Sequence, residues 1–268
     1  KITYKYIEMR ILLSVEYDGK KYHGWQEQHN PNTIQGKIQE SIYNFSQEKV
    51  KLFVAGRTDA GVHATGQVAH FDTTVDRSLE KWIMGLNSLL PEDIKINFVK
   101  YMDDSFHARF SALSRTYRYI IYNNRIKPCI NRNKVGWHYK HTLDECSMQL
   151  AANKLIGIKD FSSFRSSNCQ SSSPIRKIND IVVSRVNDYL YIDICANSFL
   201  YNMIRNLVGS LVVIGSGEKD IDWMDDLIIS KKRENGGKQF PAKGLYLINI
   251  KYDDKYNLDQ KIVYPSYY

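Results

Sequence analysis

The two halves of this chain of 268 residues carry strand-like and helix-like patterns in the same order, and this order limits the possible folds more than any single motif. In the first half, the predicted strands cover residues 10–17, 50–55, 67–71 and 94–101. One predicted helix begins near Asn32 or Thr33 and carries Ile34, Ile38, Ile42 and Phe45 at helical spacing. A second helix carries Leu79, Ile83, Leu86 and Leu90 on one face, and Pro91 stands just beyond its end.

The second half repeats this order with one insertion. Its predicted strands cover residues 116–122, 178–186, 189–196 and 245–252. One predicted helix carries Leu143, Leu150 and Leu155, another covers residues 199–214, and the insertion is a short helix near residues 221–229. The serine-rich stretch at residues 162–173 is the expected mobile loop.

Each half therefore has the β-α-β-β-α-β order of the ferredoxin-like split motif, a topology shared with RNA-recognition motifs. The predicted fold class is α+β, with two antiparallel sheets that meet at a central cleft. We place the boundary in residues 103–112, which gives an N-terminal domain of residues 1–105 and a C-terminal domain of residues 106–268.

The composition favours a soluble protein that binds an acidic partner. A net charge of +8 supplies electrostatic attraction, and 19 Tyr, 10 Phe and 4 Trp supply rings that can stack on the bases of RNA. The first ten residues alternate polar and apolar side chains, so we expect no signal peptide, and no apolar run reaches transmembrane length. The expected location is the cytoplasm, with no membrane partner.

Residues 56–71 hold the densest polar chemistry of the chain, between two apolar runs. Gly56, Gly61 and Gly66 allow a bent loop whose backbone can come close to a ligand. The loop presents a cation, a hydroxyl, a carboxylate and an imidazole within eight residues, and Asp59 stands in its middle. The same residue types also form ordinary solvated turns, so the local pattern leaves both interpretations open.

Local motifs give no support for a metal or nucleotide site. Gly36-Lys37 lacks the earlier glycine and the following hydroxyl of a P-loop, and Gly215-Ser216-Gly217 lacks the third glycine of a dinucleotide fingerprint. His63 and His70 are seven residues apart, which places them on opposite faces of a regular strand. The four cysteines are widely spaced and form no close pair. We therefore expect no metal and no cofactor.

Two further segments bear on the polar loop. Residues 106–110 and 115–122 interleave cations with aromatic rings, an arrangement that can hold phosphates and stack an unpaired base, although an edge strand with core tyrosines has the same pattern. The helix at residues 199–214 is apolar except for a narrow stripe that contains Arg205. If that guanidinium is partly buried it needs a carboxylate, for which Asp59 is a candidate across the cleft, whereas a solvated stripe is the alternative.

Residues 56–71 resemble, nearly residue for residue, the catalytic signature of the tRNA pseudouridine synthase A family. Further blocks resemble the same family in the right order. They are Tyr17-Asp18-Gly19 with residues 22–26 and 33–36, then residues 106–110 with 115–119, and finally residues 199–209 with 241–247. Ile204 stands where the family usually has Val, and Thr116 where it commonly has a second Arg.

The resemblance implies the pseudouridine synthase fold and an isomerase that detaches uracil from its ribose, rotates it and rejoins it through carbon, without a cofactor. It implies that Asp59 is the nucleophile and that Arg205 pairs with it. Tyr117 would lie against the target ring and take part in proton transfer. Arg57 would enter the space of the flipped nucleotide or clasp its phosphate, and Leu245 would line the pocket.

The substrate implied by the resemblance is tRNA, bound across the basic cleft of a homodimer, with uridines on the 3′ side of the anticodon stem-loop as targets. The wider set of expected substrate-binding residues is His63, Gln67, Arg109, Arg115 and Arg165, and Arg118 is expected to contact phosphate with them. Two other functions stay open. One is a non-catalytic RNA-binding module with RRM-like topology, and the other is a metal-independent hydrolase or transferase that uses Asp59 covalently.

Overall fold

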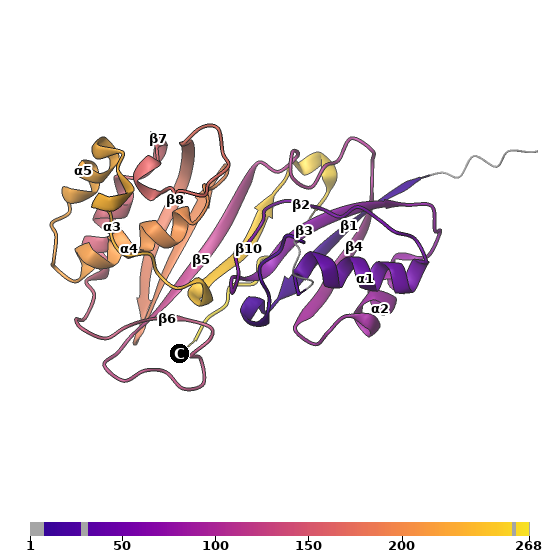
Figure 1. Ribbon diagram of the computed structural model, residues 1–268, viewed down its shortest axis with the longest axis horizontal. Helices are drawn as coiled ribbons and strands as arrows, with labels where there is room; N and C mark the ends of the chain where they lie inside the picture. The colour runs from indigo at the N-terminus through magenta and orange to yellow at the C-terminus, as the bar shows by residue number, and fades with distance from the viewer. Residues whose placement is uncertain (1–7, 28–31, 259–260, 268) are drawn as a thin grey trace, which may run out of the picture. The chain divides into compact units, whose positions relative to one another are not determined.

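The computed structural model describes residues 8–27, 32–258 and 261–267, which form two compact units (Figure 1). The first unit comprises Lys1–Leu113 and Leu247–Val263, and the second comprises Ser114–Tyr246 and Tyr264–Tyr268. This division differs from the expected domains, residues 1–105 and 106–268, because most of the last strand belongs to the first unit. Residues 1–7, part of the stretch in which the sequence predicts no signal peptide, lie outside the described residues.

The first unit follows the predicted order of elements. They are β1 (Met9–Tyr17), α1 (Ile34–Ser46), β2 (Phe53–Val54), β3 (His63–Thr73), α2 (Leu79–Leu89) and β4 (Ile94–Met102). Strand β1 pairs antiparallel with β3 and β4, and β2 pairs antiparallel with β3. Two expected bounds are wrong, because β2 has only two residues and β3 begins at His63. Residues 63–66, which the sequence predicts as loop between the strands at 50–55 and 67–71, are therefore strand.

Both helices of the first unit begin at a capped N-terminus, where a side-chain oxygen satisfies a free backbone N–H. The Thr33 side chain accepts from Gly36 N ahead of α1, which confirms the predicted start, and the Ser78 side chain accepts from Lys81 N ahead of α2. The two helices contact each other, and α2 packs against the sheet (Figure 1). The predicted apolar face of α1 is fully buried at Ile34, Ile38 and Ile42.

The second unit has the same basic order with additions that the sequence did not predict. Its elements are β5 (Ser114–Asn123), β6 (Gly136–His138), α3 (Glu145–Asn153), β7 (Gly157–Asp160), β8 (Ile175–Val186), β9 (Tyr189–Ala196), α4 (Met203–Gly215) and α5 (Trp223–Ser230). Strand β9 lies between β5 and β8, antiparallel to both, while β7 pairs with β8 and β6 runs parallel to β5. Strand β10 (Leu245–Lys251) starts in the second unit and continues beside β3 in the first. One mostly antiparallel sheet of ten strands, where two sheets were expected, together with the helices of both units confirms the α+β class.

Two helices of the second unit differ from their predicted form. In α3 the buried face is made by Met148, Ala151 and Ala152, while Leu150 is 54% exposed. Leu143 and Leu155 are buried but lie outside this helix, one before it and one after it, so the predicted apolar face was wrong. Helix α4 starts at Met203 because Asn202, with a left-handed φ of 60°, precedes it.

Candidate active site

The candidate nucleophile Asp59 lies in the connection between β2 and β3 of the first unit. In this connection Ala55 N donates to Val68 O, and a turn closes where Val62 N donates to Asp59 O. Gly61 takes a left-handed φ of 79° in that turn, which accounts for a glycine at this position. Asp59 is half-buried, whereas the side chain of Arg57, two residues earlier, is exposed. The loop therefore presents its cation to solvent.

A buried hydrogen-bond network holds this loop from beneath. The Thr58 hydroxyl shares a hydrogen bond of 2.7 Å with Tyr17 OH, and both residues are buried. Gln67 donates through Nε2 to Gly56 O at 2.7 Å and to Tyr17 OH at 3.4 Å. Gly56 and Thr58, which flank Arg57, are therefore hydrogen-bonded to side chains of β3 and β1.

Two glycines allow the segment after β1 to approach the loop backbone. A Cβ atom at Gly24, where φ is +91°, would lie 2.7 Å from Thr58 O, and one at Gly19 would lie 1.9 Å from Val62 O. At this close approach Trp25 N donates to Thr58 O at 3.0 Å. The first block of the family resemblance thus packs directly against the block that contains the candidate nucleophile.

Tyr17 belongs to this network, and sequence reasoning assigned it no role. Burial raises its pKa to about 12, although hydrogen bonds with Thr58 and Gln67 act in the opposite direction. The phenol therefore stays protonated at neutral pH and acts as an uncharged hydrogen-bonding group. Its polar tip at the end of an apolar strand, directly before Asp18-Gly19, was the available signal.

His63 and Gln67, both expected to bind substrate, are buried on β3. The Nδ1 atom of His63 accepts from Gly19 N at 3.1 Å and lies 3.0 Å from Asp18 Oδ1. Gln67 is bonded within the network beneath the loop. Both side chains are thus held by hydrogen bonds next to the loop, and their predicted role in substrate binding stays a prediction.

Tyr117, Arg205 and Leu245 all belong to the second unit, on β5, on α4 and at the start of β10. Tyr117 is 7% exposed, and its ring meets the Phe199 ring edge-on with 5.1 Å between the centroids. Leu245 is also buried, directly after the short 3-10 helix Ala242–Gly244. The second unit therefore positions both side chains through its strands.

The Arg205 guanidinium is half-buried, as the narrow polar stripe of its helix predicted. Its Nε donates to Phe240 O at 2.8 Å, and its Nη1 donates to Asn202 Oδ1 at 2.9 Å. The next residue of this helix, Asn206, is buried and donates to Phe164 O at 2.9 Å. Contacts within the second unit therefore orient the guanidinium, whereas Asn206 forms hydrogen bonds with Phe164 and Arg233.

The expected phosphate contact Arg118 is engaged within its own unit. It forms a bidentate ion pair with Asp193, with both N···O distances at 2.7 Å. Its Cζ lies 4.9 Å from the Tyr191 ring centroid and 4.7 Å from the Tyr264 ring centroid. Paired and stacked in this way, Arg118 holds the C-terminal residues to β5 and β9 and is poorly placed to contact phosphate.

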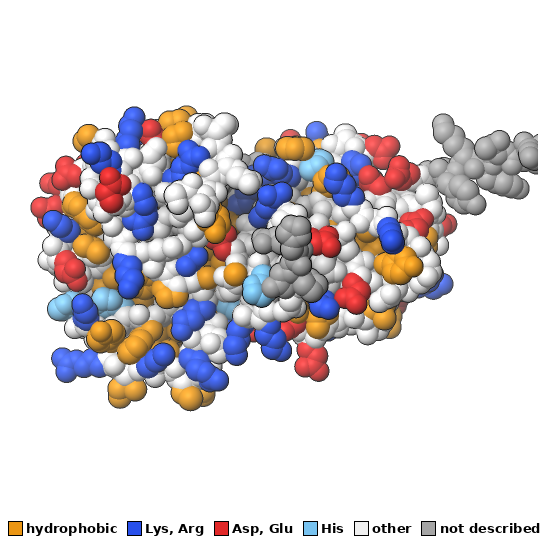
Figure 2. Space-filling model, viewed as in Figure 1, with side chains coloured by type: hydrophobic (Ala, Val, Ile, Leu, Met, Phe, Trp, Pro, Cys, Tyr) orange, Lys and Arg blue, Asp and Glu red, His pale blue; other side chains and the backbone are white. Residues whose placement is uncertain are grey.

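The other expected arginines differ in their surroundings. Arg165 donates through Nη2 to Cys169 O at 2.8 Å and Ser171 O at 2.7 Å, so the serine-rich stretch expected to be mobile is closed by hydrogen bonds. Arg115 donates to Asn197 O at 2.8 Å. Arg109 is exposed. Lys and Arg side chains are spread over the visible face of both units in Figure 2, which suits a polyanionic ligand.

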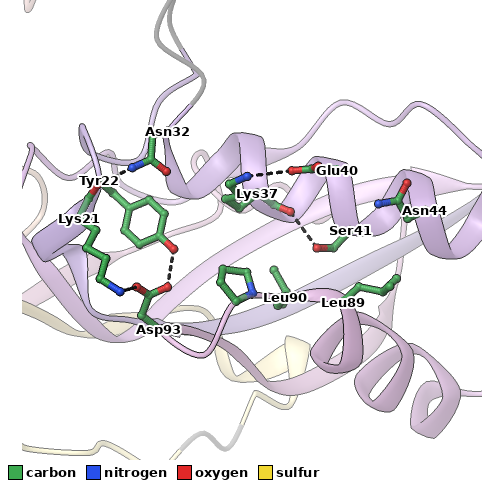
Figure 3. A pocket seen from close by; sticks show the side chains of 11 residues that line it. Lys21, Tyr22, Asn32, Lys37, Glu40, Ser41, Asn44, Leu89, Leu90 and Asp93 are labelled. Atoms are coloured by element: carbon green, nitrogen blue, oxygen red, sulfur yellow. Dashed lines mark hydrogen bonds and ion pairs between the residues drawn. The ribbon is translucent and has the colours of Figure 1, made fainter.

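A separate polar groove of about 460 Å³ lies in the first unit, between α1 and the connection from α2 to β4 (Figure 3). Tyr22 OH donates to Asp93, whose Oδ2 lies 3.5 Å from Lys21 Nζ. Lys37 pairs with Glu40 at 3.1 Å. Each lysine of the groove faces a carboxylate, and the candidate catalytic loop contributes none of the lining residues.

Metal ligands do not cluster in the described part of the chain. Among residues 8–27, 32–258 and 261–267, no group of three or more His, Cys, Asp and Glu side chains is arranged to hold a metal ion. All four cysteines are free. Within the same ranges, no helix combines the length and apolar character needed to span a membrane.

Comparison with known proteins gives matches along nearly the whole chain. A family model described as tRNA pseudouridine synthase matches residues 13–111 and 151–253. The tRNA pseudouridine synthase A of Coxiella burnetii (strain Dugway 5J108-111) is 46% identical over 258 residues, which cover 96% of this chain and 98% of the relative. The protein of the same name from Shewanella sp. (strain MR-4) is 44% identical over 259 residues, which cover 97% and 99%.

A more distant likeness comes from a solved chain in the crystal structure of a Cbf5-Nop10-Gar1 complex. It covers 89% of this chain and 49% of its own length, with a TM-score of 0.40 and 9% identity, and is too remote to support an argument. The family assignment instead depends on the matched segments, which contain Asp59, Arg205 and Leu245, and on the two full-length relatives. These matches confirm the resemblance seen in the sequence. The chain therefore belongs to the tRNA pseudouridine synthase family, whose members are isomerases that convert uridine to pseudouridine in tRNA.

Proposed function

We propose that this protein isomerises uridine to pseudouridine in tRNA with Asp59 as the nucleophile. The observation that carries this proposal is the construction of its loop. Gly56 and Thr58 are fastened by hydrogen bonds to buried side chains of β1 and β3, and Val62 N closes the turn on Asp59 O. A covalent nucleophile has to be held within a narrow range of positions, and a loop supported in this way meets that requirement.

The reaction exchanges one bond of the target nucleotide for another without changing its composition. The bond between N1 of uracil and C1′ of ribose breaks, the base rotates, and a bond between C5 and C1′ forms. A proton leaves C5 and N1 ends protonated, so the mass is unchanged. The ionised Asp59 carboxylate forms a transient covalent bond, either to the ribose or to the base, and is released when the product forms.

Arg205 is proposed to keep this carboxylate ionised and oriented. A guanidinium beside a carboxylate favours the charged form and lowers the pKa of the acid. The fixed contacts of Arg205 with Phe240 O and Asn202 Oδ1 support a defined direction for its guanidinium. Tyr117 is proposed to lie against the target ring and exchange a proton with it, and Leu245 to line the pocket.

Arg57 is proposed to enter the space that the target nucleotide leaves when it flips out of its helix. Its exposed side chain extends from a backbone that is fastened at both neighbouring residues. Arg109, Arg115 and Arg165 are proposed to contact phosphates of the substrate. By analogy with the family, the targets are uridines on the 3′ side of the anticodon stem-loop, and the protein acts as a cytoplasmic homodimer without metal or cofactor.

Unmodified tRNA made by transcription in vitro tests this proposal. The expected product is a uridine isomer of unchanged mass that forms a stable adduct with carbodiimide, mapped to single positions by primer extension. Tight binding without any isomer would indicate an RNA-binding module. Release of free uracil would indicate a hydrolase. Either result would contradict the proposed function.

A further inference from the structure

The turn formed by residues 106–111 lies between β4 and β5 and is hydrogen-bonded to three other parts of the first unit. Ala108 donates through its backbone N–H to His70 Nδ1 at 3.1 Å. The same residue accepts through its carbonyl from Tyr252 OH at 2.7 Å. Arg10 donates through Nη1 to a further carbonyl of the turn at 2.8 Å. The backbone of this turn is therefore held in place by residues that are distant in sequence.

Hydrogen bonds within the turn converge on His107. Its Nδ1 accepts from Arg109 N at 3.1 Å and from Phe110 N at 3.3 Å. Ser111 N donates to His107 O at 2.9 Å, and His107 N donates to Ser111 Oγ at 2.9 Å. Burial and the nearby Arg10 charge lower the pKa of His107, so its imidazole is neutral at neutral pH. The turn is rigid and has an uncharged ring at its centre.

This turn presents aromatic rings with cations at their edge. The Phe110 ring is 76% exposed and lies on the His107 ring, with 4.3 Å between the centroids and 34° between the planes. The Phe53 ring meets the His107 ring edge-on, with 5.2 Å between the centroids. The Arg109 guanidinium is 5.6 Å from the Phe110 centroid, and Lys51 Nζ is 5.0 Å from the Phe53 centroid. We call Phe53, His107 and Phe110 the aromatic platform.

A single exposed apolar ring on a protein surface is common and needs no explanation. The aromatic platform differs because its most exposed ring sits on a backbone that is hydrogen-bonded at several points and also packs against the His107 ring. Cations from two separate segments flank it. Rings that take an unpaired base, beside cations that take its phosphate, are the usual means of binding single-stranded RNA.

The platform lies at the opposite end of β3 from the candidate catalytic loop. His63 is at the loop end of this strand, and His70, which stacks on Phe53 with 5.0 Å between the centroids, is seven residues further along. At ~3.3 Å per residue the two ends are roughly 23 Å apart. A base on the platform is therefore a different nucleotide from the one that reacts.

We propose that the aromatic platform binds an unpaired base of the tRNA substrate, with Arg109 and Lys51 contacting its phosphates, as a second contact remote from the target uridine. This inference rests on the proposed function, since it takes tRNA as the ligand. Charge favours RNA over a second copy of the chain. A self-complementary contact would bring the same cations together from both copies, whereas phosphates neutralise them.

Phe110→Ala tests the proposal, because the ring is exposed and its removal leaves the core unchanged. Stacking of one base predicts that the affinity for unmodified tRNA falls about 5-fold to 100-fold. Turnover at saturating tRNA stays within about twofold, since the platform does not touch the reacting nucleotide. Phe110→Trp retains wild-type affinity. Met84→Ala, which removes a 66% exposed apolar side chain from α2, is the matched control and leaves the affinity unchanged.

Three measurements distinguish the possible failures. Unchanged affinity in Phe110→Ala overturns the platform, even if every variant makes pseudouridine. A change in oligomeric state by light scattering, with the affinity of each copy unchanged, identifies a second copy of the chain as the occupant and also overturns it. If wild-type protein makes no pseudouridine, the proposed function fails. A selective affinity loss in Phe110→Ala, absent in Met84→Ala, then still supports RNA binding at the platform.

Discussion

Tyr17→Phe removes one hydroxyl from the network beneath the candidate catalytic loop and leaves the aromatic ring in place. The ring packs against Trp25 with 5.9 Å between the centroids, a contact that phenylalanine keeps. The lost hydroxyl was the 2.7 Å partner of Thr58 Oγ1 and the weaker, 3.4 Å acceptor of Gln67 Nε2. A buried polar group left without its partner costs about 1–3 kcal/mol, so we expect a loss of unfolding free energy in that range.

The same change should lower the rate of the chemical step. The loop keeps its second fastening, the 2.7 Å bond from Gln67 to Gly56 O, so we expect a small displacement of Thr58 and its neighbours. Misplacement of ~1 Å can cost on the order of 100-fold, and with one fastening kept we predict that kcat falls about 10-fold. The affinity for tRNA should stay within about twofold, because the deleted atom is buried and does not reach RNA.

Single-turnover kinetics at saturating tRNA, together with denaturant unfolding, measure both effects. Tyr252→Phe is the matched control, because its hydroxyl is also buried in the first unit and donates one hydrogen bond, to Ala108 O at 2.7 Å. It should lose a similar amount of stability and keep its single-turnover rate. Wild-type rate in Tyr17→Phe, or equal rate losses in both variants, would refute the positioning role of the network.

Three further predictions follow from the same structure. Arg205→Met should lower kcat by on the order of 100-fold and change KM by less than about threefold, because it removes the proposed counter-charge of Asp59, and equal losses in both constants would contradict the pairing. The logarithm of the tRNA affinity should fall linearly with the logarithm of salt concentration, with Arg109→Gln lowering the slope by about 0.7–0.9, whereas a flat response would exclude phosphate contacts. Burial, and then the charges of His107 and Arg10, lower the pKa of His70 from 6.5 to about 4, so the fold favours the neutral imidazole. Stability should therefore be lost as the pH falls from about 6.5 towards 4, and denaturant unfolding at pH 7.5 and pH 5 should show a smaller loss in His70→Phe; equal losses would contradict this assignment.

Local sequence patterns were sufficient to predict those parts of the fold in which one short segment determines its own structure. Helix α1 starts where Thr33 caps it and buries the isoleucines that recur at helical spacing. The polar loop around Asp59 stood out because glycines and charged residues interrupt two apolar runs. In both cases the physical cause lies within about fifteen residues, so it is visible in the sequence.

Features that depend on distant residues were not predicted. Tyr17 and Gln67 support the loop through bonds to Thr58 and Gly56, and these partners are brought together only when β1 and β3 pair. Arg118 alternates with tyrosines, a pattern typical of an RNA-binding strand. However, it forms an ion pair with Asp193, which is 75 residues away in sequence, and this pair has a structural role. Side-chain periodicity does not encode such pairings, because they follow from strand register.

Pseudouridine formation by Asp59→Asn tests the central claim most directly. The substitution keeps the size and hydrogen-bonding capacity of the side chain and removes its nucleophilic charge. We predict that purified Asp59→Asn binds unmodified tRNA within about tenfold of the wild-type affinity and forms no pseudouridine in a single-turnover reaction. Pseudouridine formation above a few per cent of the wild-type rate would show that Asp59 is not the nucleophile.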